Sequence, residues 1–195
     1  LGISAKDQNK ERIFDVKKYK WFDNPKDLIK VENEKPDILV ELIGNEKGIS
    51  YELVRTALLN KINVITGNKA MLANHGKELF EIAEKNSVML LFEAAVAGGI
   101  PIIKTIKNNL FSNKFSKISG ILNGTTNYIL TKMQEENLTF EEVLKIAKTN
   151  GYTSDHEADL DIGGIDSAHK LTILSSICFG SKLNFSNNYI DGISN

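Results

Sequence analysis

The chain has 195 residues, of which 42% are hydrophobic and 25% charged, and this composition excludes disordered, collagen-like and membrane-embedded chains. Its 24 Lys and Arg residues against 25 Asp and Glu residues give a net charge of −1, which argues against nucleic-acid binding through a large basic surface. The single cysteine, Cys178, cannot form an internal disulfide, and no apolar run approaches the ~20 residues that span a bilayer. We therefore expect a cytoplasmic protein that binds neither nucleic acid nor membrane.

The length and the two ends indicate an incomplete protein. The chain is longer than the ~150 residues of a typical domain but does not reach two full domains, so one domain with an extension or two incomplete domains would fit. It starts at Leu1 rather than at a methionine, and it stops in the polar segment 185–195. We expect a soluble protein whose beginning and end are both missing.

The first half alternates short β-rich runs with helical patterns, which is typical of βαβ units on a parallel sheet. Asn24 and Pro25 open a helix as N-cap and first helical residue, and Ser50 caps another. The unbroken apolar run 88–92 suits a strand buried on both faces. The pattern predicts strands over residues 1–5, 37–43, 62–66 and 88–92, and helices from residue 24, over 50–60 and over 68–86.

The pattern changes at a run of small residues, Glu93–Pro101, which permits close backbone approach and marks the expected domain boundary. Beyond it, the sequence predicts a strand over 117–122, helices over 123–136, 139–149 and 165–179, and an acidic loop over 151–164. The predicted fold class is α/β, with a first domain over residues 1–92 and a second over residues 93–195.

Lys69 is the first candidate for chemistry. Its segment, Thr66–Ala70, follows a strand at the edge where open α/β sheets place their ligands. A lysine there could contact a phosphate or an oxyanion. The alternative is a solvated residue at the start of a helix.

Asp166 and Lys170 form a second candidate, since residues four apart share one face of a helix. The alternative is that they are simply an exposed ion pair. The preceding loop adds four carboxylates, those of Asp155, Glu157, Asp159 and Asp161. Such a cluster of like charges favours a cation among them, either a substrate ammonium or Lys170 itself.

The third candidate is the segment Gly120–Tyr128, which runs from a predicted strand straight into a helix. Backbone N–H groups and the Thr125 hydroxyl face outward at that helix N-terminus, which attracts anions such as a carboxylate. A plain helix start capped by Asn123 is the alternative.

Five segments, taken in this order, resemble the successive signatures of the homoserine dehydrogenase family. They are Val40–Gly44, Thr66–Ala70, Phe92–Lys104, Gly120–Tyr128 and Asp161–Lys170. The resemblance spans nearly the whole chain. It implies a partial Rossmann-type dinucleotide-binding domain over residues 1–92 and an α+β catalytic and dimerisation domain over residues 93–195. The family's Gly-x-Gly-x-x-Gly fingerprint should precede Leu1, so the resemblance also implies a fragment without this N-terminal loop and without the C-terminal part.

In this family the enzyme interconverts L-homoserine and L-aspartate 4-semialdehyde with NAD or NADP and works as a homodimer, in a step of threonine, methionine and isoleucine biosynthesis. The catalytic residues that the resemblance implies are Lys170 and, across the cleft, Lys69. The implied substrate-binding residues are Asp155, Asp161, Asp166, Thr125 and Tyr152. The implied cofactor-binding residues are Lys6, Gly44, Lys69 and Gly151, with Lys6 favouring NADP. The implied ligands of a monovalent cation, expected to be sodium, are the carbonyls of Glu93, Val96, Gly98 and Ile100.

The carboxylate assigned to Asp155 keeps two alternatives, Ser154 and Glu157, because the spacing between Gly151 and Lys170 is one residue longer than in the family. Two other functions also remain open. One is a two-domain dehydrogenase for another substrate, and the other is a non-catalytic dimerising module that has lost cofactor binding. A glycine-rich fingerprint within roughly thirty residues upstream of Leu1 would separate the enzyme from the module.

Overall fold

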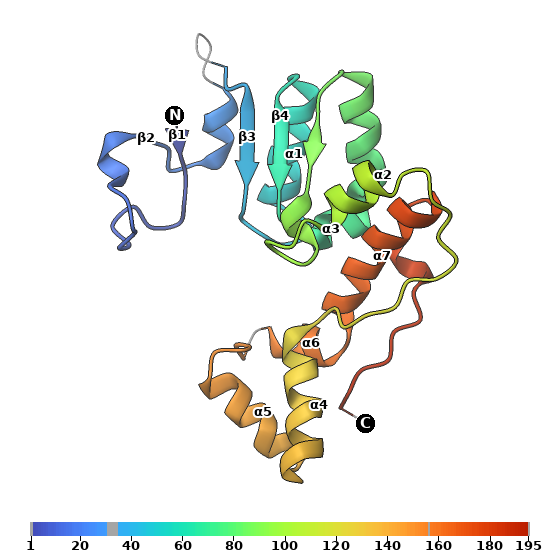
Figure 1. Cartoon of the computed structure of the whole chain (residues 1–195). Helices are drawn as coiled ribbons and strands as arrows, with labels where there is room; N and C mark the ends of the chain where they lie inside the picture. Colours follow the sequence, from blue (N-terminus) through green and yellow to red (C-terminus); the bar gives the residue numbers. More distant parts are fainter. Residues whose placement is uncertain (1, 31–34, 156, 195) are drawn as a thin grey trace. The chain divides into compact units, whose positions relative to one another are not determined.

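The computed structural model describes residues 2–30, 35–155 and 157–194 (Figure 1). The chain divides into two compact units, one of residues 1–71 and 75–92 and the other of residues 72–74 and 93–195. They are termed the sheet unit and the helical unit. None of the helices formed by the described residues is long and apolar enough to cross a membrane.

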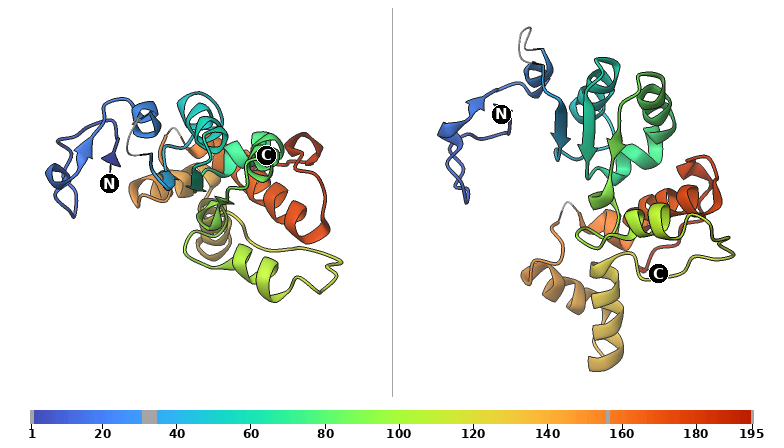
Figure 2. Two further views of the ribbon diagram at one scale, coloured as in Figure 1. Left: turned by 90° about the horizontal axis from the view of Figure 1, so that it is seen from above. Right: turned by 45° about the horizontal axis from the view of Figure 1, so that its top comes forward.

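The sheet unit is built on three parallel strands in the order β3-β4-β5. β3 (Ile38–Glu41) pairs along its whole length with β4 (Asn63–Thr66), which in turn pairs with β5 (Leu90–Leu91). The connections are the helices α1 (Ile49–Leu59) and α2 (Lys69–Lys85). Two right-handed crossovers that advance in one direction place both helices on the same face of the sheet, and the views in Figure 2 agree with this arrangement.

Burial along the strands follows the pleat of the sheet. Leu39, Val64 and Leu90 are buried in the core that the two crossover helices cover. The prediction that residues 88–92 are buried on both faces is wrong, since Met89 and Leu91 are 58% and 46% exposed. An apolar run cannot distinguish the two faces of a strand, and here both crossovers cover only one of them.

A second, two-stranded sheet joins β1 (Gly2–Ile3) to β2 (Lys20–Trp21) in parallel. Of these two strands, β1 lies within the predicted strand 1–5, whose first residue, Leu1, is outside the described residues. Short 3₁₀ helices lie on either side of β2, over Val16–Lys18 and Pro25–Ile29. The predicted helix start is confirmed, because Asn24 Oδ1 accepts the Lys26 N–H at 3.0 Å.

Ser50 does not cap α1, although the sequence predicts that it does. The N-cap is Gly48, with φ +73°, and Ser50 lies inside the first turn with its side chain fully buried. Its hydroxyl donates to Glu41 Oε1 at 2.8 Å. A buried hydroxyl needs a partner, and here a partner on β3 outweighs the local preference of serine for a cap. At α2 the predicted start is confirmed, with Asn68 as N-cap.

The helical unit begins with a 3₁₀ turn over Glu93–Ala95 and ends with another over Phe185–Asn187. Its helices are α3 (Ile102–Lys104), which continues as a π-helical turn over Thr105–Asn109, α4 (Gly124–Glu136), α5 (Phe140–Thr149), α6 (Ala158–Ile162) and α7 (Ile165–Phe179). The predicted Thr139 cap of α5 is confirmed, as a capping box with Glu142. α4 packs on α5 through the fully buried side chains of Ile129, Val143 and Ala147.

Two predicted features of the helical unit are wrong. Residues 117–122 form no strand, and the segment 151–164 is not a loop throughout, because α6 occupies part of it. A strand needs a neighbour for its N–H and C=O groups, and among the residues that the structure describes none pairs with 117–122. The fold class itself, α/β, is confirmed by the parallel sheet and its crossover helices.

Candidate functional site

Lys170 lies on α7 and is held from two sides. Its Nζ donates to Asp166 Oδ2 at 2.5 Å and to the backbone carbonyl of Leu122 at 2.7 Å. The two side chains of the ion pair are only 19% and 12% exposed, so solvent screens their charges weakly. An ammonium has three N–H donors, and these two bonds fix its direction while one donor remains for a further acceptor.

Asn123 joins this pair to a second carboxylate. Its Nδ2 donates to Asp161 Oδ1 at 2.7 Å and to Asp166 Oδ2 at 2.9 Å. The other oxygen of Asp161, Oδ2, accepts from the Thr153 hydroxyl at 2.9 Å. Side chains from the start of α4, from α6 and from α7 thus meet in one polar cluster. This lysine cluster consists of Asn123, Thr153, Asp161, Asp166 and Lys170.

The local backbone explains why these residues converge. Asn123 is the N-cap of α4, and its Oδ1 accepts the Thr126 N–H at 2.8 Å, which leaves its amide nitrogen to reach both carboxylates. Gly163 is the C-cap of α6, and Gly164, with φ +77°, is the N-cap of α7, so that only these two residues separate the helices. The sharp turn brings Asp161 and Asp166 to the same amide. A cavity of about 250 Å³, lined in part by Leu122 and Asp161, adjoins the cluster.

Thr125 and Tyr152, both predicted to bind substrate, contact each other. The buried Thr125 hydroxyl donates to the backbone carbonyl of Tyr152 at 3.0 Å. The half-exposed Tyr152 ring stacks on Tyr128 with 4.2 Å between the ring centroids. These contacts hold Tyr152 against α4. Because Tyr152 directly precedes Thr153, they help to position that member of the lysine cluster.

Gly151, predicted to contact the cofactor, lies in the helical unit where α5 ends. Its φ of +75° suits a glycine after a helix C-terminus. It lines a cavity of about 450 Å³ together with Thr153 and Asp155. Through Thr153 this cavity adjoins the lysine cluster.

Asp155 is not part of the lysine cluster. Its side chain is 93% exposed, and its Oδ1 lies 2.7 Å from Lys148 Nζ at the end of α5. The two alternatives for the same role bond to each other, since Ser154 Oγ donates to Glu157 Oε2 at 2.9 Å. Of the carboxylates predicted to bind substrate, the structure brings Asp161 and Asp166 together and leaves Asp155 apart.

We expect the pKa of Asp155 to lie below its ordinary value, because the hydrogen bond and the charge of Lys148 favour the ionised carboxylate. A depressed pKa in the folded state means that the stabilisation is present above the ordinary pKa and is lost as the pH falls through the depressed one. Lys148→Met should therefore raise the pKa of Asp155 toward its ordinary ~3.9, as followed by a carboxyl NMR titration. Lys145→Met, on the same helix, is the control and should leave it unchanged. An Asp155 pKa that does not respond to Lys148→Met would contradict the pairing.

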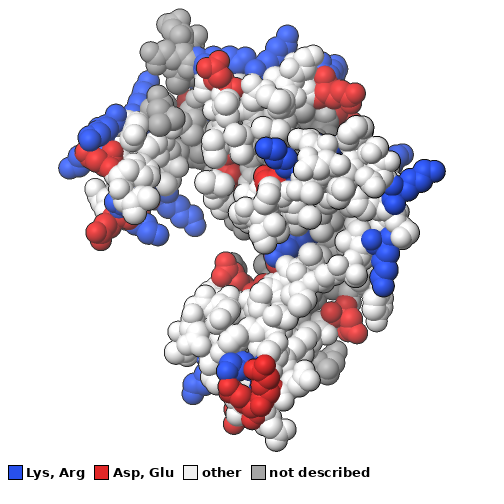
Figure 3. Space-filling view, in the orientation of Figure 1, with Lys and Arg blue, Asp and Glu red and all other residues white. Residues whose placement is uncertain are grey.

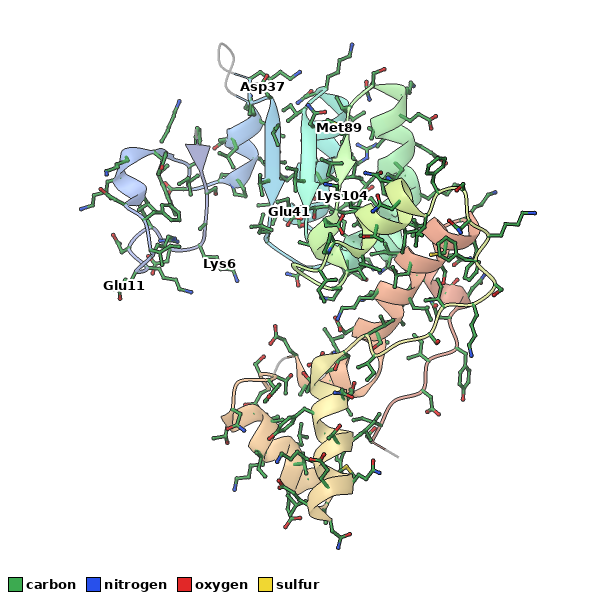
Figure 4. The ribbon with its side chains drawn as sticks, in the orientation of Figure 1. Lys6, Glu11, Asp37, Glu41, Met89 and Lys104 are labelled. Carbon is green, nitrogen blue, oxygen red and sulfur yellow. The ribbon has the colours of Figure 1, made fainter. Side chains whose placement is uncertain are left out.

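In the sheet unit, the predicted cofactor residues follow the strands. Lys6 is exposed beyond β1 (Figure 4). Lys69 is the half-buried first residue of α2. Gly44 follows β3 with φ +82°, and nothing lies within 4 Å of the position that a Cβ would occupy there. Lys69 belongs to the sheet unit and Lys170 to the helical unit. Figure 3 shows basic and acidic side chains interspersed over the face that it draws.

The loop predicted to bind a monovalent cation is tightly turned. Ala97 and Gly98 have successive positive φ values of 61° and 57°. The side chain of Glu93 accepts the backbone N–H groups of Ile103 and Lys104 in α3 at 2.9 and 3.0 Å. The carbonyls of Glu93 and Ile100 each accept a backbone N–H as well, the first from Val96. A carbonyl oxygen has two lone pairs, so these bonds leave both oxygens able to accept a cation.

Sequence reasoning missed two members of the lysine cluster. Asn123 is recognised from the sequence only as a helix cap, and Thr153 is not singled out. The signal for Asn123 is its position next to Leu122. The Leu122 carbonyl accepts from Lys170, and the amide of Asn123, one residue later, donates to Asp166, the partner of that lysine. Thr153 gives no comparable signal, because only the folded course of residues 150–161 places its hydroxyl on Asp161.

Comparison with known proteins gives matches along nearly the whole chain. Residues 2–93 match the family model described as "Homoserine dehydrogenase, NAD binding domain", and residues 101–195 match the model described as "Homoserine dehydrogenase". The homoserine dehydrogenase of Neisseria gonorrhoeae is 48% identical over 160 residues, which are 81% of this chain and 36% of that protein. The one of Helicobacter pylori is 41% identical over an alignment of 196 positions, which covers 99% of this chain and 45% of that protein.

Solved structures show the same similarity. The crystal structure of a homoserine dehydrogenase from Thiobacillus denitrificans has a TM-score of 0.89 and 40% identity, and the match covers 99% of this chain and 44% of that one. A hyperthermophilic archaeal homoserine dehydrogenase in complex with NADPH has a TM-score of 0.73 and 32% identity, covering 84% of this chain and 49% of that one. The chain thus spans less than half the length of each of these four relatives.

Proposed function

Because the chain belongs to the homoserine dehydrogenase family, we propose that the protein carrying it interconverts L-homoserine and L-aspartate 4-semialdehyde with NAD or NADP. This reaction serves the biosynthesis of threonine, methionine and isoleucine. The observation that carries the proposal is the lysine cluster. In it, one ammonium group with a fixed orientation lies beside two carboxylates. An ammonium group can move a proton, and a carboxylate can bind the amino group of an amino acid.

Lys170 is the proposed acid and base. When bound, the nicotinamide ring of the cofactor takes the hydride from homoserine or returns it to the aldehyde. In the reducing direction the Lys170 ammonium donates a proton to the aldehyde oxygen, and in the oxidising direction its neutral amine accepts the proton of the hydroxyl. The bonds to Asp166 and to the Leu122 carbonyl support this role, because they hold Nζ in place before the substrate arrives.

Asp161 is the proposed partner of the substrate ammonium. It accepts hydrogen bonds from two neutral groups, the Asn123 amide and the Thr153 hydroxyl. These bonds orient the carboxylate without cancelling its charge, so it can attract a cation. Asp166 forms an ion pair with Lys170 and is proposed to position that lysine.

Three other residues are proposed around the substrate. The Thr125 hydroxyl is already engaged with the Tyr152 carbonyl, which supports a shaping role for both residues. Asp155 could reach a substrate only from the exposed cavity that it lines with Gly151. Its ion pair with Lys148 would compete with such a contact.

The sheet unit is the proposed nucleotide-binding part, with Lys6, Gly44 and Lys69 as contacts. Gly151 is proposed as a further cofactor contact. The residues fit a dinucleotide in one respect, because the open Gly44 lies beyond the carboxyl end of a parallel strand, where α/β sheets bind nucleotides. Lys6 follows the first strand, where a positive charge would favour the 2′-phosphate of NADP.

A monovalent cation, sodium, is proposed at the carbonyls of Glu93, Val96, Gly98 and Ile100. The successive positive φ values at Ala97 and Gly98 support it, because a tight curl can direct several carbonyl oxygens inward. We further propose that the protein is a cytoplasmic homodimer. No specific observation favours a non-catalytic module or another substrate.

The experiment is an activity assay of the full-length protein. NADP and L-homoserine together should give NADPH, whereas L-2-aminobutyrate, which has the same ammonium and carboxylate but no hydroxyl, should give none. NAD in place of NADP, and Lys6→Ala with each nucleotide, measure the cofactor preference. A protein that binds NADPH but does not oxidise L-homoserine would point to another substrate and refute the proposal.

A further inference from the structure

Glu41 is a buried carboxylate that the chemistry proposed above does not use. It is the last residue of β3, its side chain is 1% exposed, and Figure 4 labels it where that strand ends. Burial of a carboxylate costs free energy unless hydrogen bonds satisfy it. Its partners therefore show which parts of the sheet unit this charge holds.

Four neutral donors satisfy the carboxylate. Oε1 accepts the N–H of Ile43 at 2.7 Å, the N–H of Gly44 at 3.2 Å and the Ser50 hydroxyl at 2.8 Å. Oε2 accepts the Thr66 hydroxyl at 2.6 Å. The donors belong to the loop after β3, to the first turn of α1 and to the end of β4. One side chain thus connects β3 to the loop after it, to α1 and to β4.

Asn68 extends this network to the next helix. Its N–H donates to Thr66 Oγ1 at 3.0 Å, and its Nδ2 donates to Ser50 Oγ at 2.9 Å and to the Asn45 carbonyl at 2.6 Å. Both hydroxyls that donate to the buried carboxylate therefore accept from the same residue. Asn68 is also the N-cap of α2, so the hydrogen bonds run without interruption from β3 to the helix that Lys69 begins.

The loop after β3 has a backbone that needs such support. Gly44 and Asn45 have successive φ values of +82° and +69°, a left-handed conformation that is unfavourable for a side-chain-bearing residue. The bond to the Gly44 N–H and the bond to the Asn45 carbonyl each fix one of these residues. Both loops of the network follow the carboxyl ends of adjacent parallel strands, where open α/β sheets place their ligands.

We propose that Glu41 is a positioning residue for the nucleotide, which holds the loop 42–45 and the start of α2 in the one arrangement that the nucleotide contacts. This inference rests on the function proposed above. A binding loop that is already fixed loses little freedom when its ligand binds, and this strengthens binding without any direct contact from the fixing residue. Glu41 acts through Gly44 and Lys69 and touches neither substrate nor cofactor.

The test is Glu41→Gln in the full-length protein. The amide has nearly the same shape but only one acceptor oxygen, so it cannot accept from Thr66 on one side and from the three donors on the other. We expect the KM for NADP to rise about tenfold, as for the loss of a hydrogen bond to a charged group. The value of kcat at saturating NADP and the KM for L-homoserine should change by less than about twofold. Glu52→Gln is the matched control, because Glu52 lies on α1 with its side chain at the surface, paired with Lys26, and it should leave all three constants unchanged.

If Glu41 has a purely structural role, Glu41→Gln should lower the melting temperature without raising the KM for NADP more than it changes kcat and the KM for L-homoserine. An unchanged KM for NADP in folded Glu41→Gln would overturn the inference. If Glu41→Gln does not fold, Ser50→Ala and Thr66→Val each remove one donor. Each should raise the same KM by a smaller factor, and no rise in either would also overturn the inference. A wild-type protein that neither binds nucleotide nor oxidises L-homoserine would overturn the proposed function and this inference with it, whereas an active wild type with an unaffected variant overturns the inference alone.

Discussion

Lys170→Ala should lower kcat for L-homoserine oxidation by about a thousandfold, within the range that a positioned acid and base contributes. The physical reason is the loss of the one ammonium group that the lysine cluster directs by two bonds. The dissociation constant for NADPH, measured by fluorescence titration, should remain unchanged. Added methylamine should restore part of the activity, because a small amine can occupy the space of the missing side chain and move the proton.

The matched control is Lys132→Ala on α4, which removes a partly exposed lysine paired with Glu136 and should leave kcat unchanged. The pair that Lys170 forms is much less exposed, so the stability of the variant must be measured alongside its activity. A melting curve that still shows a folded protein assigns the loss of kcat to chemistry. Undiminished turnover in folded Lys170→Ala would remove Lys170 from the mechanism.

Asp161→Asn should raise the KM for L-homoserine by about a hundredfold and change kcat less. Removing one partner of a partly buried charge pair costs about 2–5 kcal/mol, and the substrate ammonium is the proposed partner. The substitution keeps the shape of the side chain, and its remaining oxygen can still accept from Asn123. Steady-state kinetics at saturating NADP measure the effect.

Asp159→Asn is the control for this variant. Asp159 lies two residues earlier on α6, it is exposed, and its replacement changes the net charge by the same amount. It should leave the KM for L-homoserine unchanged. An equal rise in both variants would show a general effect of the acidic segment, and no rise in Asp161→Asn would refute the contact with the ammonium.

The sequence predicts those elements of the fold whose stability is local. α7 spans the predicted range 165–179, and α5 begins at the predicted Thr139 cap, because helical periodicity and caps act over a few residues. The strand expected over 117–122 is absent, since a strand depends on a neighbour that its own residues do not encode. Ser50 shows the same limit, because its partner Glu41 lies nine residues earlier on another element.

In the candidate site too, contacts between residues close in the sequence can be predicted, and contacts that depend on the fold cannot. Asp166 and Lys170 can be paired from the sequence, because one helical turn separates them. Asp161 is connected to this pair through the turn at Gly164 and through the amide of Asn123, the N-cap of α4. No local sequence pattern predicts both contacts. Asp155 is a converse case, since the charge pattern groups it with Asp161 whereas the fold pairs it with Lys148.

Asn123 precedes Gly124, and asparagine followed by glycine is the sequence most prone to spontaneous deamidation. The aspartate formed would still cap α4, since aspartate and asparagine are equally good N-caps. It would also exchange a donor for an oxygen that faces the carboxylates of Asp161 and Asp166, now 2.7 and 2.9 Å from the amide nitrogen. Conversion of this single amide to aspartate would therefore keep the helix cap and place a third carboxylate beside those of Asp161 and Asp166, so the chemical lifetime of the site can be shorter than that of the fold.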